Sequence, residues 1–576
     1  MYGTLPIAMK TSKQTFLIAC LFAGLFLLGC TSEPDAPGSE SATPQAAEAP
    51  TAALESITTG TLTAAIQTLA SDEFEGRAPS SPGEEKTVTF LQDEFKRLGL
   101  EPGNGDRYVQ EVPLVAITVT NAPTLALSGG DTTQNLAYGD DHVVWSKRVV
   151  DTSSIENAEL VFVGYGIVAP EYDWNDYAGL DVEGKTVVIL VNDPGFATQD
   201  EAVFNGNTMT YYGRWTYKFE EAARQGAAGA LIVHQTEPAG YGWGTVRASW
   251  TGPQFSLASE DDNMGRVPVE GWLTAEAAQQ LFSMAGQDYH ALRERAAQPG
   301  FEAVPLGVQA SVALANTFER STSNNVLARW PGTERADEYV FYMAHWDHFG
   351  RDPNLEGDQI YNGALDNATG TAGLLEIAEA FTRLDEKPAR SVVFLAVTAE
   401  EQGLLGSAYY ATHPVYPRNK TVAAINMDAL NTLGPMNDIT VVGYGNSELD
   451  DLVEEAAEAA GRVVRPDPEP EKGYYYRSDH FSFAKEGIPA LYTDSGIDHV
   501  EHGEQWTRQQ RQVYLDNHYH KPSDEYDPAW DLQGTVDDLR LLFIVGHRLA
   551  TSSAFPNWRE GTEFKAKRDA DRAGAN

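Results

Sequence analysis

The sequence contains very little cysteine. Only two of its 576 residues are cysteines, Cys20 and Cys30, and both lie near the start of the chain. The chain from residue 31 onward therefore offers no disulfide bond and no metal site with cysteine ligands. A metal bound in this part of the protein needs histidine and carboxylate ligands instead.

Positive charge is scarce as well. The chain has 41 lysines and arginines against 83 aspartates and glutamates, which gives a formal net charge of −42. Nucleic-acid-binding proteins need a basic surface that neutralises phosphates, and so we expect no nucleic-acid partner. The simplest interpretation of the acidic excess is a well-solvated surface.

The apolar run near the start is too short to form a membrane-spanning helix of about 20 residues. It covers residues 16–28, follows Lys10 and Lys13, and has the pattern of a secretory signal. It ends in Leu27-Leu28-Gly29-Cys30, which resembles a bacterial lipobox. The resemblance implies an exported protein that is lipid-anchored at Cys30, at the outer membrane or facing the periplasm. Membrane contact would then occur only through this lipid, and the alternative is an uncleaved anchor.

Further along the chain, short apolar runs alternate with helix-like segments. Runs of strand length cover 340–344, 391–398 and 421–426, while 369–381 and 449–460 have helical spacing. This alternation predicts an α/β fold with a mostly parallel, mixed central sheet and helices on both faces. The block of about 155–305 shows a second, smaller and β-rich α/β pattern.

Each of the three predicted strands leads into residues that can bind a metal. His345 follows the first strand, Glu400 and Glu401 follow the second, and Asp428 follows the third. In open α/β sheets, sites form in the crevice at the carboxyl ends of the strands. We therefore expect these side chains to converge although they lie far apart in the sequence.

Three further residues extend this set of candidates. Asp366 lies just before the helical segment 369–381, where its side chain can cap the helix or bridge two cations. His520 lies on a late loop, and the neighbouring His518 is an alternative to it. Asp347, two residues after His345, can accept a hydrogen bond from the second ring nitrogen of that histidine.

The number of candidate ligands indicates two metal ions rather than one. A catalytic zinc usually has three protein ligands and one open position. Two histidines and three carboxylates are too many for one such ion, but they serve two ions if Asp366 bridges. Mixed imidazole and carboxylate ligands suit Zn²⁺, with cobalt or manganese as substitutes.

Together these motifs resemble the dizinc exopeptidase family of bacterial leucine-type aminopeptidases, glutamate carboxypeptidases and the transferrin receptor. The motifs that carry the resemblance are His345-Trp-Asp347, Asp366-Asn-Ala-Thr-Gly370, Thr398-Ala-Glu-Glu-Gln-Gly403, Asn426-Met-Asp428, Arg477-Ser-Asp-His480, Tyr519-His-Lys-Pro-Ser-Asp524 and the N-terminal Phe74-Glu-Gly-Arg77. The block of about 155–305 resembles the protease-associated domain that is inserted in several peptidase families.

The resemblance implies a role for each candidate. Two Zn²⁺ ions would be held by His345, Asp366, Glu401, Asp428 and His520, with Asp366 bridging. His345 and Asp428 would complete one site, and Glu401 and His520 the other. Glu400 would be the general base and Asp347 the orienting acid. His348 is an extra candidate ligand that we interpret as structural.

The resemblance also implies how the chain is divided into domains. We expect a lipoprotein signal peptide (1–30), a disordered tether (31–52), an N-terminal part of the peptidase domain (53–150), an inserted protease-associated domain (151–310), the catalytic dizinc domain (311–556) and a flexible tail (557–576).

The expected activity is that of an aminopeptidase, which removes residues from peptide N-termini through a hydroxide that bridges two zinc ions. The substrates would be peptides, and the sequence does not indicate an oligomeric state. The spacing from His345 to Asp366 is longer than the resemblance associates with glutamate carboxypeptidases, although Arg477 keeps a carboxypeptidase or dipeptidase open. A single-zinc glutaminyl cyclase and a non-catalytic binding homologue are the remaining alternatives.

Overall fold

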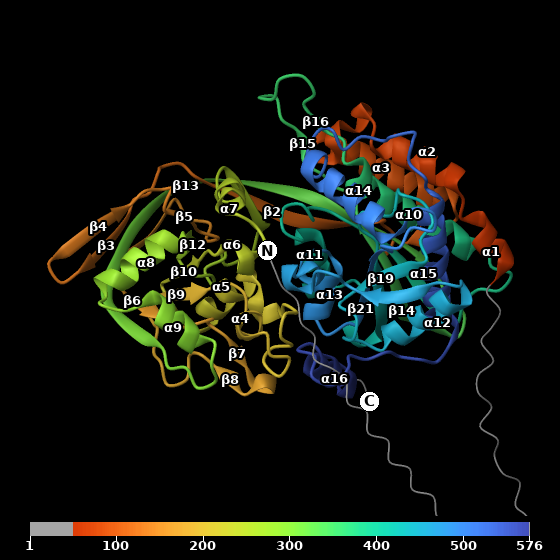
Figure 1. Ribbon diagram of the computed structural model, residues 1–576. Coiled ribbons are helices and arrows are strands. Elements are labelled where there is room, and N and C mark those ends of the chain that lie inside the picture. The colour runs from red at the N-terminus through yellow and green to blue at the C-terminus, as the bar shows by residue number, and fades with distance from the viewer. Residues whose placement is uncertain (1–49, 575–576) are drawn as a thin grey trace, which may run out of the picture. The chain divides into compact units, whose positions relative to one another are not determined.

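The computed structural model describes residues 50–574, which Figure 1 draws as a coloured ribbon. The predicted signal peptide, the lipidation site Cys30 and nearly all of the predicted tether lie outside this range. The tether's last residues are described, and there a helix, α1 (Thr51–Ser56), already begins. Over residues 50–574, no helix combines the length and the apolar composition that crossing a membrane requires.

The first sheet contains the three strands that lead into candidate ligands. These strands are β14 (Arg335–His345), β17 (Arg390–Val397) and β18 (Thr421–Asn426), and β14 pairs in parallel with both of the others. β21 (Ala490–Ser495) extends the parallel run beside β18. β13 (Val304–Trp330) and β19 (Asp438–Val442) pair antiparallel at the two sides of this run. The predicted mostly parallel, mixed sheet is thus confirmed.

Helices cover both faces of this sheet, as predicted (Figure 1). On one face Tyr342 of β14 packs with α10 (Thr369–Thr382) and α15 (Gln533–Thr551) in a large apolar core. On the other face Phe341 contacts α11 (Leu405–Thr412) and α13 (His480–Lys485) through Tyr410 and Phe483. Because neighbouring strand residues point to opposite faces and both faces are covered, a run such as 340–344 must be apolar throughout.

Two helices near the start of the described chain agree with the spacing of apolar residues. The apolar residues of 61–69 and 84–98 recur at helical spacing, and these stretches lie in α2 (Thr59–Leu69) and α3 (Pro82–Arg97). α3 begins at Pro82, where Ser81 caps it by accepting hydrogen bonds from the N–H groups of Gly83 and Glu84. Pro82 fits the first position, where a helix needs no N–H donor.

A second sheet occupies the middle of the sequence. β6 (Thr152–Phe162), β9 (Thr186–Leu190), β10 (Gly229–Val233) and β12 (Val269–Leu273) are neighbours in that order and run in parallel. β5 (His142–Trp145) pairs antiparallel with β12. Between β9 and β10 lies α5 (Trp215–Arg224), so this block has the α/β pattern that its sequence predicts.

The long strand β13 belongs to both sheets. Its first half pairs with β6, and its second half pairs with β17 and with β2 (Val109–Val119). The chain therefore leaves the first sheet after β2, returns to it briefly as β11 (Pro253–Leu257), which pairs antiparallel with β2, and re-enters it along β13. We call the part between them, residues 120–303, the inserted layer; that it is a protease-associated domain remains a prediction.

The inserted domain was predicted to begin at residue 151, but the inserted layer begins earlier, at residue 120. β3 (Leu125–Gly129), β4 (Thr132–Leu136) and β5 precede residue 151, yet their pairing partners lie in the second sheet. The short β-type runs of 108–150 look alike in the sequence. Their membership in one sheet or the other is decided by long-range pairing, which periodicity does not reveal.

The predicted flexible tail, residues 557–576, is wrong for the part that is described. α16 (Lys565–Ala573) forms there, and Trp558 and Arg568 are each only 1% exposed. Trp558 donates its indole N–H to the carbonyl of Gly487, and Arg568 donates to the carbonyls of Thr421 and Val422. The segment was predicted to be flexible because most of its residues are polar, and its composition does not show that Trp558 and Arg568 are buried.

Candidate metal centre

The side chains predicted to bind metal converge where the parallel strands end. His345 is the last residue of β14, Glu401 follows β17 and Asp428 follows β18. Asp366 lies in the turn Ala364–Ala368 that leads into α10, and His520 follows α14 (Gly503–Asn517). The ligand atoms of His345, Asp366 and Asp428 lie within 4.8 Å of one another.

Asp366 lies between two histidines. Its Oδ1 atom is 3.2 Å from Nε2 of His345, and its Oδ2 atom is 3.3 Å from Nε2 of His520. The same nitrogen of His345 is 3.2 Å from Oδ1 of Asp428, and that of His520 is 3.2 Å from Oε2 of Glu401. The five residues thus form two groups of three that share one carboxylate.

The alternative ligand His518 lies outside both groups. Its Nδ1 atom is 2.9 Å from the carbonyl oxygen of Ser523, which is a loop contact. His520 has a positive φ of 56°, a backbone conformation that is uncommon for residues with a side chain. This conformation accompanies the placement of the imidazole beside Asp366 and Glu401.

The carboxylate of Asp347 does not hold the His345 ring as predicted. The Nδ1 atom of His345 is 3.2 Å from the backbone carbonyl of Asp347, while the carboxylate is more distant at 3.9 Å. The carboxylate instead accepts a hydrogen bond of 3.0 Å from the backbone N–H of Glu400. Asp347 therefore orients the turn that carries Glu400 and Glu401, and its main-chain oxygen orients the histidine.

His348 is closer to the site than its structural interpretation suggests. It is fully buried, and its Nδ1 atom lies 2.5 Å from Oε1 of Glu401. Its ligand atom, together with those of Asp366 and Glu401, forms another group within 4.8 Å. Burial lowers the pKa of His348 to about 4, so the ring is neutral near pH 7 and able to accept a proton or a metal.

Burial and mutual contact set the charges of the cluster. Burial alone would raise the pKa of Asp366, but hydrogen bonds from His345 and His520 outweigh it and hold that pKa well below its usual value. Burial raises the pKa of Glu400 well above its usual value, and so do the nearby Glu401 and Asp428. Burial also raises the pKa of Glu401 well above its usual range.

This donor set fits zinc. Carboxylates crowded into a buried site repel one another unless cations lie among them. Imidazole nitrogens and carboxylate oxygens are ligands that Zn²⁺ accepts, and the two oxygens of Asp366 face different histidines. The residues that would hold such ions are His345, Asp366, Asp428, Glu401 and His520, with His348 beside the last two.

Comparison with known proteins agrees with this site. Residues 325–544, which include all seven predicted site residues, match the family described as Peptidase family M28. The chain carries an M28 peptidase domain. This domain spans the first sheet from the end of β13 to α15, and so it contains the strands whose ends form the cluster.

Similar proteins include aminopeptidases and a carboxypeptidase homologue. The chain is 36% identical over 138 residues to Aminopeptidase NAALADL1 of Mus musculus, covering 23% of this chain and 17% of that protein. It is 25% identical over 369 residues to the probable glutamate carboxypeptidase AMP1 of Arabidopsis thaliana, covering 59% and 47%. The chain thus spans less than half the length of these curated relatives.

A solved structure is similar over most of the chain. The aminopeptidase from Aneurinibacillus sp. strain AM-1 aligns with 88% of this chain and 97% of its own, with 21% identity and a TM-score of 0.48.

Several residues that support the M28 site had no role in the sequence-based prediction. Asp524 accepts hydrogen bonds from the backbone N–H groups of Leu365 and Asp366, at 3.0 and 3.1 Å. Ser478 donates to the carboxylate of Asp428 and accepts from the amide of Asn426. Their motifs were visible in the sequence, but only the fold shows which backbone groups they hold.

Arg77 supports the site from the N-terminal segment. Its guanidinium is 1% exposed and donates to the backbone carbonyls of Leu69, Trp346, Asn362 and Gly363, at 2.6–2.9 Å. Trp346 adjoins His345, and Gly363 precedes the turn that carries Asp366. Arg77 thus ties together the segment that follows β14 and the turn that carries Asp366.

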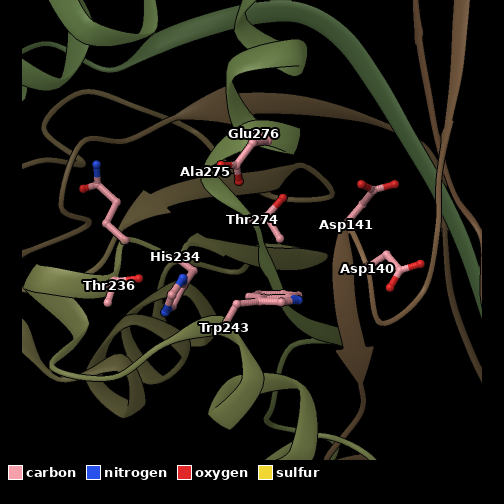
Figure 2. Close-up of a pocket in the computed structure, with 9 residues that line it drawn as sticks. Asp140, Asp141, His234, Thr236, Trp243, Thr274, Ala275 and Glu276 are labelled. Carbon is pink, nitrogen blue, oxygen red and sulfur yellow. The ribbon is translucent and has the colours of Figure 1, made fainter.

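A cavity of about 460 Å³ lies elsewhere, in the inserted layer (Figure 2). It opens where β10 and β12 end, since His234 and Thr274 directly follow those strands. Asp141 and Trp243 line it from other segments. Nε2 of His234 donates to the carbonyl oxygen of Tyr241 at 2.9 Å, so one ring nitrogen is already engaged. This cavity is separate from the residues of the metal cluster.

Proposed function

We propose that this protein is a zinc metallo-exopeptidase that removes residues from the N-termini of peptides. One observation carries the proposal: the two oxygens of Asp366 each face a different histidine, and each histidine faces a second carboxylate. This arrangement suits two Zn²⁺ ions per chain. The M28 domain and the aminopeptidase named among the relatives support peptide hydrolysis.

The chemistry divides between the ions and the side chains. When bound, the two zinc ions would polarise the scissile carbonyl and lower the pKa of a water molecule. Glu400 accepts the proton of the attacking water and delivers it to the leaving amine. Its carboxylate oxygen lies within 4.8 Å of the ligand atoms of His345 and Glu401, so it is near the reacting centre. Asp347 holds this base in place through the Glu400 N–H.

A substrate panel tests the choice between aminopeptidase and carboxypeptidase. Peptides with a free N-terminus and a C-terminal amide are compared with N-blocked dipeptides that have a free C-terminus. We expect cleavage of the first set and little cleavage of the second. Cleavage confined to the N-blocked set would replace the proposal with the dizinc carboxypeptidase or dipeptidase.

The proposal extends to location. The run 16–28 and the sequence Leu27-Leu28-Gly29-Cys30 support export and lipidation at Cys30. Mass spectrometry of the N-terminal peptide from membranes would find a lipid on Cys30. In Cys30→Ser the protein would leave the membrane fraction, and an unchanged distribution would contradict the lipid anchor.

A further inference from the structure

The cavity in the inserted layer lies where the ends of two parallel strands meet a turn and a helix. His234 directly follows β10, and Thr274 directly follows β12 and caps α8 (Ala275–Met284). Ligand sites in α/β folds form at the carboxyl ends of such strands. Asp141 and Trp243 reach the same cavity from other parts of the layer (Figure 2). The volume of about 460 Å³ is in the range of pockets that bind small molecules.

Hydrogen bonds between these segments hold the walls of the cavity in place. The backbone N–H of Thr274 donates to the carbonyl of Asp141 at 2.9 Å. The indole N–H of Trp243 donates to the carbonyl of Gly139, also at 2.9 Å. Oδ2 of Asp141 accepts from the backbone N–H of Ala137 at 2.8 Å. A ligand therefore binds here without having to order the surrounding chain, which favours affinity.

One nitrogen of His234 is left for a ligand. The residue is only 4% exposed. Its Nε2–H donates to the carbonyl oxygen of Tyr241, and a neutral imidazole that donates from one nitrogen accepts at the other. Nδ1 has no hydrogen-bond partner within residues 50–574 and is not sealed off by protein atoms, so it faces the cavity that the ring lines. Burial lowers the pKa of His234, which keeps this acceptor available near pH 7.

The charge of the lining is negative. Asp140, Asp141 and Glu276 border the cavity, and no lysine or arginine among residues 50–574 lines it. Asp141 uses Oδ2 to hold its own turn, which leaves Oδ1 for a ligand. Glu276 lies in the first turn of α8, where its charge offsets the positive end of that helix. The lining thus favours a cation over an anion.

Trp243 adds an aromatic surface to these acceptors. Figure 2 shows its ring edge-on, with one face toward the other side chains that line the cavity. The electron-rich face of an indole attracts cations, and it does so more strongly where water is partly excluded. The hydrogen bond to Gly139 fixes the orientation of the ring.

The spacing of the acceptors favours an organic cation over a metal ion. Within residues 50–574, the groups of three close ligand atoms that suit a metal all belong to the M28 site, and His234 is in none of them. An ammonium or guanidinium group is larger than a metal ion and carries several N–H donors. Such a group can contact an imidazole nitrogen, a carboxylate and an indole face at once.

We propose that this cavity binds an organic cation whose ammonium or guanidinium group donates to Nδ1 of His234 and to Asp141 and lies against the ring of Trp243. This binding is independent of the proposed peptidase function, because the cavity shares no residue with the metal centre. Two sources carry such a group: a free amine, and the side chain of a lysine or arginine in a peptide.

Isothermal titration calorimetry of the zinc-loaded protein tests the proposal. Cadaverine and agmatine are the free amines, 1,5-pentanediol is the neutral control, and an N-acetylated, C-amidated Ala-Lys-Ala peptide represents the second source. We expect one molecule of an amine or of the peptide to bind per chain and the diol not to bind. The ligand that binds identifies the source. Binding of MnCl₂ at the cavity in place of the amines, or no binding of any cation, overturns the proposal.

Variants place the bound cation in the cavity. His234→Phe keeps a ring but removes the acceptor, and Asp141→Asn removes a charge while its amide oxygen can still accept from Ala137; each should weaken binding about tenfold. Trp243→Leu should weaken it about threefold to thirtyfold.

Glu294→Gln is the matched control, because Glu294 is an exposed carboxylate on α9 (Tyr289–Ala296) that does not line the cavity. It should bind the cation as the wild type does. If His234→Phe does not fold, Asp141→Asn and Trp243→Leu decide. Affinities within about twofold of the wild type in both of these variants contradict the site, whether or not the protein cleaves peptides.

Discussion

The Nε2 atom of His520 lies 3.3 Å from the Oδ2 atom of Asp366. The other oxygen of that carboxylate faces His345, which comes from the opposite end of the M28 domain sequence. His520 is reached through an exposed helix and a residue with positive φ, so its position depends on the fold of a loop. It is the ligand for which the sequence offered an alternative.

The two histidines of that loop should behave differently when replaced. His520→Ala should lose one of two bound zinc ions and nearly all activity, because the imidazole that faces both Asp366 and Glu401 is removed. His518→Ala should keep both ions, since its ring contacts only the carbonyl of Ser523. Metal content per chain, measured by atomic spectroscopy, decides between them. Loss of zinc in His518→Ala with full zinc in His520→Ala would reverse the assignment.

Glu400→Gln should separate chemistry from metal binding. The amide keeps the size of the side chain but cannot accept the proton of water, so kcat should fall by about a hundredfold to ten-thousandfold. Zinc content should stay near that of the wild type, because Glu400 is not among the five proposed ligands. Near-normal turnover in this variant would assign the proton transfer to another group.

Arg77→Ala should strongly destabilise the protein. Four backbone carbonyls lose their donor, and buried unpaired acceptors cost about 1–3 kcal/mol each, so the free energy of unfolding should fall by more than about 3 kcal/mol. Arg383→Ala, which removes an exposed pair with Glu379, should cost less than about 1 kcal/mol. Urea unfolding measures both. Similar losses in the two variants would mean that Arg77 does not brace the loops.

The stability of the protein should respond to pH through Asp450. This carboxyl is 3% exposed, and burial raises its pKa to about 6. A raised pKa means that the folded state holds the proton more tightly than the unfolded state, so this contribution to stability is present at low pH and is lost as pH rises through about 6. Asn at position 450 does not ionise, so Asp450→Asn does not lose stability in this way. The unfolding free energy of Asp450→Asn minus that of the wild type should therefore rise by about 1 kcal/mol between pH 5 and pH 7.

The control for this pH dependence is the neighbouring Asp451, which is largely exposed. Asp451→Asn should show no comparable change between pH 5 and pH 7. If the unfolding free energies of Asp450→Asn and wild type run parallel over that range, the Asp450 carboxyl is ionised in the folded protein at pH 5.

Much of the M28 site follows from the sequence because its ligands are tied to regular structure. His345 and Asp428 stand at the ends of buried strands, and apolar runs predict such strands well. Their convergence then follows from the geometry of a parallel sheet. The bridging role of Asp366 was predicted from two facts: a carboxylate has two oxygens, and the candidate ligands are too many for one ion.

Other features depend on contacts that no local pattern reveals. The sequence suggested that the Asp347 carboxylate holds the His345 ring, but two residues after a strand end the chain turns, and the carboxylate reaches Glu400 instead. The pairing of β3 with β13 in the second sheet and the burial of Trp558 are likewise products of long-range packing.

The zinc content of the purified, active protein tests the two-metal site most directly. The shared carboxylate of Asp366 predicts two zinc ions per chain, with both lost together in Asp366→Ala. One zinc ion per fully active chain, or full activity in zinc-free protein, would contradict the two-metal peptidase.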